Sequence, residues 1–148
     1  MKVLNERMPF DKKKLKMDNF RPNIVVRGKA AFAEDLWATA TIHSSCSSSS
    51  SSSSSSNNND LRMAIVKPCS RCTIPAVDPD SGCVDKDNTV TRVLKLFRQG
   101  KQLVFSKSLR HRGKWGGEVF FGTNAVPLMA ADGSSVEVSV GQSFSVTE

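Results

Sequence analysis

Cysteine is scarce in this chain of 148 residues, and long apolar runs are missing from it. The four cysteines, at positions 46, 69, 72 and 83, are neither dense nor regularly spaced. This pattern does not match a secreted scaffold held by disulfides. Residues 1–20 lack the continuous apolar segment of a secretory signal, and no stretch reaches the ~18 apolar residues that span a bilayer. We therefore expect a soluble protein in a reducing compartment.

Positive charge is in excess, with a formal net charge of +7. A basic chain can bind nucleic acid, an anionic membrane surface or a phosphorylated ligand. The densest basic segment is residues 12–16, Lys-Lys-Lys-Leu-Lys, and its simplest interpretation is a solvated loop. Neither an RNA-binding aromatic signature nor a DNA-binding helix pair accompanies it, so we expect no nucleic-acid partner. A basic nucleic-acid-binding fragment remains a third, minor hypothesis.

One low-complexity tract interrupts the chain. Residues 44–60 are almost wholly Ser and Asn, broken by Cys46. Such a tract has no apolar surface to offset its ordering entropy, so we expect a disordered loop. It joins two strand candidates, and a hairpin tip tolerates long insertions because loop-closure entropy grows slowly with length. We interpret 1–148 as one interrupted domain; an interdomain linker is the alternative.

The rest of the chain is mainly β in pattern. Apolar residues at 90, 93, 94 and 97 have helical spacing, which predicts a helix over 89–98 that ends near Gly100. A short helical turn is expected within 30–37. Turn signals lie at 78–82, 132–133 and 141. Short β-branched or alternating segments predict strands at 23–27, 38–43, 61–67, 118–121, 135–140 and 143–146. The fold class is therefore α+β, mainly β, and barrel-like or sandwich-like with one clear helix.

Cys69 and Cys72 form a C-x-x-C pair that four chemistries can use. A zinc site needs about four ligands, and the other Cys and His residues lack the usual spacing. A redox dithiol expects a helix N-terminus within a βαβ unit, whereas this pair follows a strand candidate. Two buried structural thiols are always an option. The fourth interpretation is a single thiolate ligand to a soft metal, with Arg71 favouring the thiolate or pairing with a bound oxyanion.

Longer motifs around this pair resemble the MOSC domain, in the branch of the mitochondrial amidoxime-reducing component and its bacterial relatives. The resemblance follows the chain order and covers most of it outside the Ser/Asn tract. It rests on Phe-Arg-Pro-Asn-Ile-Val-Val at 20–26, Ala-Phe-Ala-Glu-Asp-Leu-Trp at 31–37, and 67–82, which contains Lys-Pro-Cys-Ser-Arg-Cys. Shorter matches are 4–7, 97–98, 121–124 and 140–141.

The resemblance implies a β-barrel-like domain that binds the pterin-based molybdenum cofactor, molybdenum-molybdopterin. The second cysteine of the Cys-Ser-Arg-Cys motif, here Cys72, then supplies the protein sulfur to molybdenum and is the catalytic and metal-binding residue. By the same analogy Arg21 and Asn23, together with Ser70 and Arg71, lie near the cofactor. The physical chemistry agrees, because guanidinium groups suit the cofactor phosphate and the cofactor performs the redox step.

The family reduces N-hydroxylated compounds such as amidoximes. In eukaryotic members electrons come from a cytochrome b5 and its NADH-dependent reductase. The resemblance therefore implies an oxidoreductase with these partners and a small N-hydroxylated substrate, either soluble or associated with mitochondria.

A second function comes from the same resemblance. MOSC domains also form the C-terminal part of molybdenum-cofactor sulfurases, so the alternative is a non-catalytic carrier or binding module for sulfur or pterin. A persulfide on Cys72 or Cys69 is expected in that case. The resemblance to sulfurases also implies pyridoxal phosphate binding, although the chain is too short to contain the sulfurase domain that binds this cofactor.

Two departures from the family pattern carry expectations. The upstream barrel segment, with much of the phosphate-binding surface and any membrane anchor, does not precede residues 4–5, so we interpret the chain as N-terminally truncated. We expect the isolated chain to be marginally stable, to aggregate or to need a partner, because strands without partners expose backbone groups. The Ser/Asn tract replaces a short hairpin loop. Glu34 and Asp35 are interpreted as a solvated turn without a catalytic role.

Overall fold

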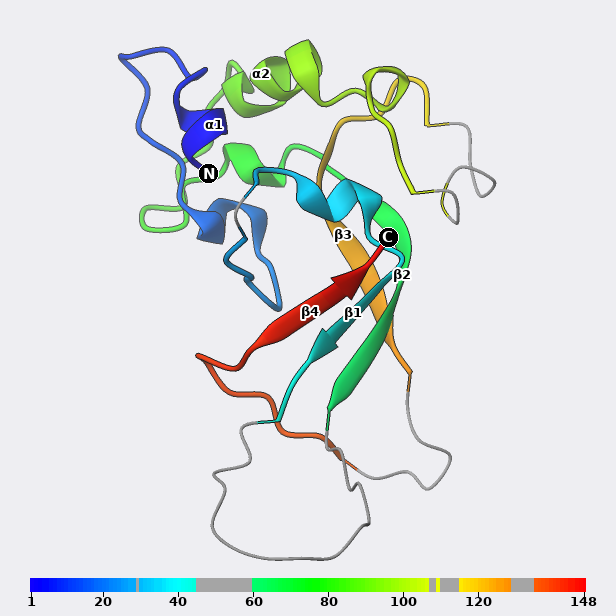
Figure 1. The fold of residues 1–148 in the computed structure, drawn as a ribbon. Coiled ribbons are helices and arrows are strands. Elements are labelled where there is room, and N and C mark those ends of the chain that lie inside the picture. Colours follow the sequence, from blue (N-terminus) through cyan, green and yellow to red (C-terminus); the bar gives the residue numbers. More distant parts are fainter. Residues whose placement is uncertain (29, 45–59, 107–108, 110–114, 129–134) are drawn as a thin grey trace, which may run out of the picture.

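A computed structural model describes residues 1–28, 30–44, 60–106, 109, 115–128 and 135–148. Its strands form an antiparallel sheet in the order β3-β2-β1-β4, and the helices lie beyond one end of that sheet (Figure 1). The strands are β1 (Thr39–Ile42), β2 (Leu61–Ser70), β3 (Phe120–Pro127) and β4 (Phe144–Thr147). The helices are α1 (Lys2–Asn5) and α2 (Thr89–Phe97). Four 3-10 turns accompany them: η1 (Met17–Phe20), η2 (Ala33–Leu36), η3 (Ile74–Ala76) and η4 (Gly100–Gln102). The predicted α+β class is confirmed.

The β1–β2 hairpin follows from alternation of side chains along the strands. Ala40 and Ile42 of β1 are buried, and Thr39 and Thr41, which alternate with them, are half-buried. A strand with period 2 places these two sets on opposite faces of the sheet. Ile42 pairs with Leu61 in the antiparallel register. The two strands that flank the Ser/Asn tract are therefore neighbours in one sheet, as predicted; residues 45–59 of the tract lie outside the described residues.

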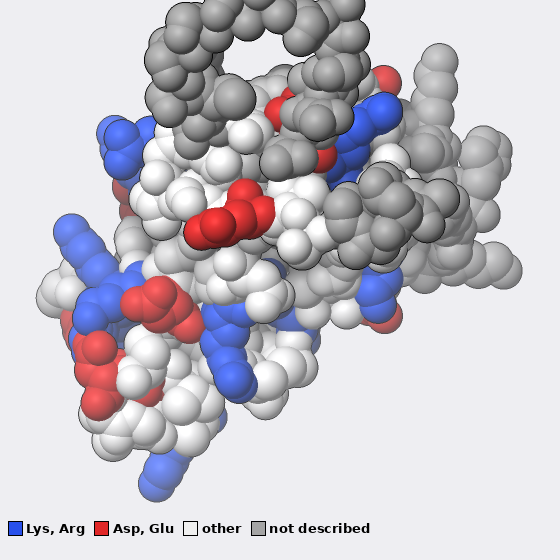
Figure 2. Space-filling view, turned by 90° about the horizontal axis from the view of Figure 1, so that it is seen from below, with Lys and Arg blue, Asp and Glu red and all other residues white. Residues whose placement is uncertain are grey.

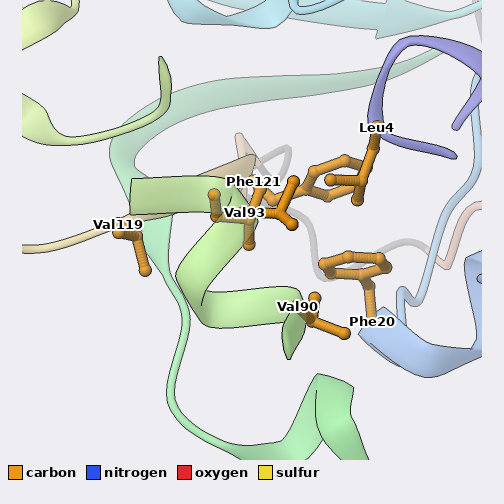
Figure 3. Packing of buried hydrophobic residues seen from close by; sticks show 7 residues of the cluster. Leu4, Phe20, Val90, Val93, Val119 and Phe121 are labelled. Atoms are coloured by element: carbon orange, nitrogen blue, oxygen red, sulfur yellow. The ribbon is translucent and has the colours of Figure 1, made fainter. Parts of the chain in front are cut away.

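The first two residues of β3 divide the core into two clusters. Phe120 and Phe121 are both buried, and successive strand residues point to opposite faces. Phe120 packs with residues of β1 and β2, namely Ala40, Ile42, Met63 and Ile65, and with Phe105 and Leu109. Phe121 joins a second cluster between the sheet end and the helices, with Leu4, Phe20, Val90, Val93, Leu94 and Val119 (Figure 3).

Helix α2 contributes its apolar stripe to this second cluster. Val90, Val93 and Leu94 are buried, and Phe97 packs against the cluster from a half-buried position. This is the predicted helical spacing, and the helix begins and ends within one residue of the predicted bounds. The stripe fixes α2 over the same cluster that receives Phe20, so the helix also positions the η1 turn.

A buried ion pair joins three of these elements. Arg98, directly after α2, is only 2 % exposed, and its two terminal nitrogens contact the Asp35 carboxylate of η2 at 2.6 and 2.8 Å. Its Nε donates to the carbonyl of Phe120 at 3.0 Å, and its guanidinium carbon lies 4.2 Å from the centre of the Phe32 ring. Arg98 occupies the next position of the Val90–Leu94 stripe, four residues further on, so a charge there requires a buried partner.

The described strands form an open sheet with β3 and β4 at its edges, so the predicted barrel is not confirmed. Two predicted strands are wrong. Residues 23–27 are irregular and unpaired within the described structure, with Ile24, Val25 and Val26 exposed to 44 %, 60 % and 38 %. Residues 135–140 are also irregular. Both segments have β-forming residues, but β propensity is realised only when a strand packs and pairs with neighbours.

From the buried ion pair we predict that Asp35→Asn lowers the stability of the fold. The substitution leaves the Arg98 guanidinium buried without a compensating carboxylate, which costs about 3–5 kcal/mol for a pair of this kind. We expect the urea midpoint of unfolding to fall sharply. The matched control is Asp87→Asn, which removes an exposed partner of Lys12 and should barely move the midpoint. Equal effects of the two substitutions would show that the buried pair does not hold the fold.

Candidate functional site

Cys72 lies where the chain leaves the sheet. β2 ends at Ser70, and η3 begins at Ile74 with Pro75 in its first turn, a position where proline is favoured. The thiol of Cys72 is exposed, and its sulfur accepts a hydrogen bond from the backbone N–H of Ile74 at 3.5 Å. A thiol placed in this way is open to a ligand on one side and held by a backbone donor on the other. Ser70, at the end of β2, is also exposed.

Arg71 points back into the protein and links the sheet to η1. Its Nε donates to the carbonyl of Phe121 at 2.8 Å, and its Nη1 donates to the carbonyl of Phe20 at 3.0 Å. Its own backbone N–H bonds to Val119 at 2.9 Å. The sequence suggested Arg71 as a partner for a bound anion; the structure places much of its hydrogen-bonding capacity on protein carbonyls. Arg71 is therefore a residue that positions the site.

This contact brings three of the resemblance motifs together. The carbonyl of Phe20 precedes Arg21, and the carbonyl of Phe121 precedes Gly122, so one guanidinium joins the motifs at 20–26, 67–82 and 121–124. The Phe20 and Phe121 rings stack at 4.0 Å between centroids. Gly122 has φ +78, a backbone conformation that favours glycine, and a Cβ there would be in ordinary contact with Nη2 of Arg71 at 3.5 Å.

Arg21 and Asn23 are exposed and follow η1 directly. Arg21 has φ 49, in the left-handed region that residues with a Cβ rarely adopt. A backbone held in this region by its surroundings is often found at a functional site. Because Arg71 fixes the carbonyl of Phe20, the backbone of Arg21 is tied to the Cys72 segment. Exposed Arg21, Asn23, Ser70 and Cys72 are thus attached to one braced junction.

Two carboxylates that the sequence suggested to be solvated are buried or partly buried. Asp35 binds Arg98, as described above, so the interpretation of a solvated turn is wrong there. Burial raises the pKa of the Glu34 carboxyl, and the Asp35 carboxylate adds to this effect. Arg98 and the backbone N–H of Gly122 oppose it. Glu34 therefore lies near the 121–124 segment. The signal in the sequence was Arg98, a charge in the apolar stripe of a predicted helix.

Among the described residues, Cys69 and Cys83 do not join Cys72 in a metal site. Cys69 is half-buried, Cys83 is exposed, and Cys46 lies outside the described residues. Across the described ranges, Cys, His, Asp and Glu side chains form no group of three that could hold a metal ion. Zinc held by protein ligands therefore gains no support from this part of the chain.

The basic segment pairs with an acidic loop. Lys12 contacts Asp85 and Asp87, Lys13 contacts Asp78 and Asp80, and Lys16 contacts Asp80, all at 2.7 to 3.1 Å. Between the two segments lies a cavity of about 240 Å³ that Cys83 also lines. On the face shown in Figure 2, Lys and Arg are interspersed with Asp and Glu. The run is a largely exposed loop, as predicted, and three of its lysines in addition form ion pairs with aspartates of the same chain.

Comparison with known families assigns the chain. The MOSC domain matches residues 1–144. This chain belongs to the MOSC domain family. Mitochondrial amidoxime reducing component 2 of Homo sapiens is 39 % identical over 95 residues, which are 64 % of this chain and 22 % of that protein. Mitochondrial amidoxime-reducing component 1 of Homo sapiens is 35 % identical over 96 residues, 65 % of this chain and 23 % of that protein. The same component of Xenopus laevis is 30 % identical over 99 residues, 67 % of this chain and 23 % of that protein.

This MOSC chain spans about a fifth of the length of the curated relatives it matches. Those relatives carry mitochondrial names. Pyridoxal phosphate binding receives no support from these matches. Within the described residues, no helix combines the length and apolar character needed to cross a membrane.

Arg71→Ala tests the junction of the MOSC chain. The substitution removes the bonds from a charged donor to the carbonyls of Phe20 and Phe121, which should cost about 2 kcal/mol or more of unfolding free energy. Amide hydrogen exchange should quicken around Arg21 and Gly122. Arg92→Ala, at an exposed position of α2, is the matched control and should change neither quantity. Unchanged exchange at both segments in Arg71→Ala would contradict the bracing role.

Asp78 provides a pH test of the lysine–aspartate contacts. The hydrogen bond from Lys13 and then the backbone N–H of Asp80 lower the pKa of Asp78 from 3.8 to about 2. Because the carboxyl pKa is lowered, the contact stabilises the fold at pH values above the ordinary carboxyl pKa. This stabilisation is lost as the pH falls through about 2. NMR titration should place the Asp78 midpoint there. Lys13→Ala should raise this midpoint, and Lys14→Ala should not; an ordinary midpoint in the wild type would exclude the contact.

Proposed function

We propose that this chain holds a molybdenum–pterin cofactor through the Cys72 thiolate and acts in the reduction of N-hydroxylated compounds such as amidoximes. The observation that carries the proposal is the single exposed thiol of Cys72 at the junction of the three motifs. Membership of the MOSC family and likeness to amidoxime-reducing components support it.

The donor set fits a metal that arrives inside an organic cofactor. A thiolate prefers soft or thiophilic metals. Cys72 offers one sulfur and leaves the outer side of that sulfur exposed. A metal bound by one protein thiolate takes its remaining ligands from elsewhere, and a metal carried by a pterin brings such ligands with it. The exposed guanidinium of Arg21 suits the phosphate of the same cofactor.

Each residue of the junction then has a distinct task. Cys72 binds the metal, and the N–H of Ile74 stabilises negative charge on its sulfur. Arg21, Asn23 and Ser70 offer polar groups to the pterin and its phosphate. Arg71 positions Arg21 relative to Cys72 through the Phe20 carbonyl. When bound, the cofactor supplies the redox chemistry that reduces the N–O bond of the substrate.

The source of the electrons is part of the same proposal. We propose a cytochrome b5 and its NADH-dependent reductase as partners and a mitochondrial association for the working protein. The chain spans about a fifth of the length of these curated relatives, so the activity and the partners are proposed for it separately from the likeness. In this proposal Cys72 supplies the metal ligand.

Cys72→Ala tests the ligand. In a host that makes the cofactor, the purified wild type should contain molybdenum, and Cys72→Ala should lose most of it, because the substitution removes the proposed bond from the protein to the metal. Cys83→Ala, which removes the other exposed thiol of the described residues, is the control and should retain the metal. Reduction of an amidoxime by a chemical electron donor should follow the metal content. Equal, negligible molybdenum in wild type and Cys72→Ala would refute the ligand assignment.

A carrier role uses the same exposed sulfur. The thiol of Cys72 is as accessible to a persulfide sulfur as to a metal. Intact-protein mass spectrometry separates the two functions. A persulfide on Cys72 without molybdenum would favour a non-catalytic carrier of sulfur or pterin.

A further inference from the structure

A serine, a histidine and an aspartate form a hydrogen-bonded chain across three strands, away from the Cys72 junction. His43 follows β1, Asp60 precedes β2, and Ser145 lies in β4. The Nε2 atom of His43 is 2.7 Å from Oγ of Ser145, and its Nδ1 atom is 2.9 Å from Oδ2 of Asp60. The side chain of His43 is half-exposed, and Ser145 is exposed. The chain of contacts is therefore open to a small molecule.

The strand register places the three side chains on one face of the sheet. Ser145 pairs with Thr41, which is two residues before His43 and so faces the same side. Ile42 and Ala40 face the buried cluster on the opposite side. The neighbouring contact between Thr39 and Thr147, 2.7 Å between hydroxyl oxygens, is an ordinary polar bridge between β1 and β4. His43 differs from it because a carboxylate stands on one side of the ring and a hydroxyl on the other.

Asp60 determines the direction of these hydrogen bonds. The backbone N–H of Ser44, 2.9 Å from Oδ1, and the ring of His43 lower the pKa of the Asp60 carboxyl, so it is a carboxylate at neutral pH. A carboxylate only accepts, so Nδ1 of His43 carries the proton and donates it. In the neutral ring Nε2 is then an acceptor, and the hydroxyl of Ser145 donates to it. This is the arrangement that activates a serine nucleophile.

We propose that Ser145 is a nucleophilic serine, activated by His43 and Asp60, which takes acyl groups from small esters. Oγ of Ser145 attacks the carbonyl carbon, and its proton passes to Nε2 of His43. The bond to the leaving alcohol breaks as that alcohol receives the proton. Water then attacks the acyl-serine, His43 takes a proton from the water and returns it to Oγ, and the acid leaves.

The surroundings limit the substrate class. Within the described sheet β4 pairs only with β1, so alternate backbone N–H groups of β4 face its open edge. Backbone N–H groups are the donors that stabilise the oxyanion of acyl transfer. The three side chains lie on a surface and not within the cavity described above. The site therefore suits small acyl esters, with little selectivity among them.

A fluorophosphonate probe tests the proposal in the chain of 148 residues. The serine oxygen displaces fluoride from phosphorus, so the label remains on the reacting residue and peptide mapping locates it. We expect the label on Ser145. Ser145→Ala should abolish this label, and Ser143→Ala, two residues away on the same strand side, should leave it unchanged. His43→Gln should slow labelling about 100-fold or more, as loss of a general base does.

Folding is checked by thermal unfolding of each variant. If His43→Gln does not fold, mapping in the wild type decides: labelling of Ser145 in preference to Ser143 supports the site. No label on Ser145, equal labelling of both serines, or an unchanged rate in folded His43→Gln would overturn the proposal. The outcome is independent of molybdenum, because the probe reacts with the protein whether or not Cys72 holds a metal.

Discussion

The arrangement of helices and strands in this MOSC chain depends on the contacts of one buried guanidinium, that of Arg98. It is almost completely buried, and it contacts the Asp35 carboxylate, the Phe120 carbonyl and the Phe32 ring. A charge removed from water is tolerated only when its partners are in place, since an unpaired buried ion costs several kcal/mol. The end of α2, the η2 turn and the start of β3 therefore have one mutual placement in which all three contacts form.

A second guanidinium extends this constraint to the candidate site. Arg98 holds the carbonyl of Phe120, and Arg71 holds the carbonyl of Phe121, the next residue of β3. The two phenylalanine rings enter the two core clusters on opposite faces. The start of β3 is thus held by hydrogen bonds from two guanidinium groups and by the packing of one phenylalanine ring on each face of the sheet. Through Arg71 the same segment positions Phe20, and with it Arg21 and the exposed thiol of Cys72.

Local patterns were sufficient for the elements that pair with a sequence neighbour or carry their own stripe. The strands predicted at 38–43, 61–67 and 143–146 and the helix predicted at 89–98 correspond to β1, the first seven residues of β2, β4 and α2. The strand predicted at 23–27 is wrong. Its residues are as β-branched as those of a real strand, but a strand forms only where a neighbouring strand is in place to pair with it. No local signal distinguishes Ile24 in an irregular segment from Ile42 in β1.

The candidate site divides in the same way. Motif resemblance correctly indicated the family, and its choice of Cys72, Arg21 and Asn23 as site residues stays a prediction. It was not enough to give Arg71 its bracing contacts, which join residues 50 and 51 positions apart. The partner of Arg98 is 63 positions away, and Asp60, His43 and Ser145 meet only through the sheet register. Contacts of this range are set by topology, which the residues of one segment do not encode.

Because Ile42 pairs with Leu61, the length of the Ser/Asn tract has little effect on the rest of the fold. The two strand ends are already adjacent in the ladder, and the carboxylate of Asp60 bonds the backbone of Ser44 just outside it. Doubling the length of a connection between such fixed ends costs only about 0.6 kcal/mol. Serine codons can therefore be gained or lost there with little effect on folding, and homologous chains can differ in tract length while keeping the same sheet. The hairpin is for the same reason a natural place to graft a tag or a small domain whose termini are close together.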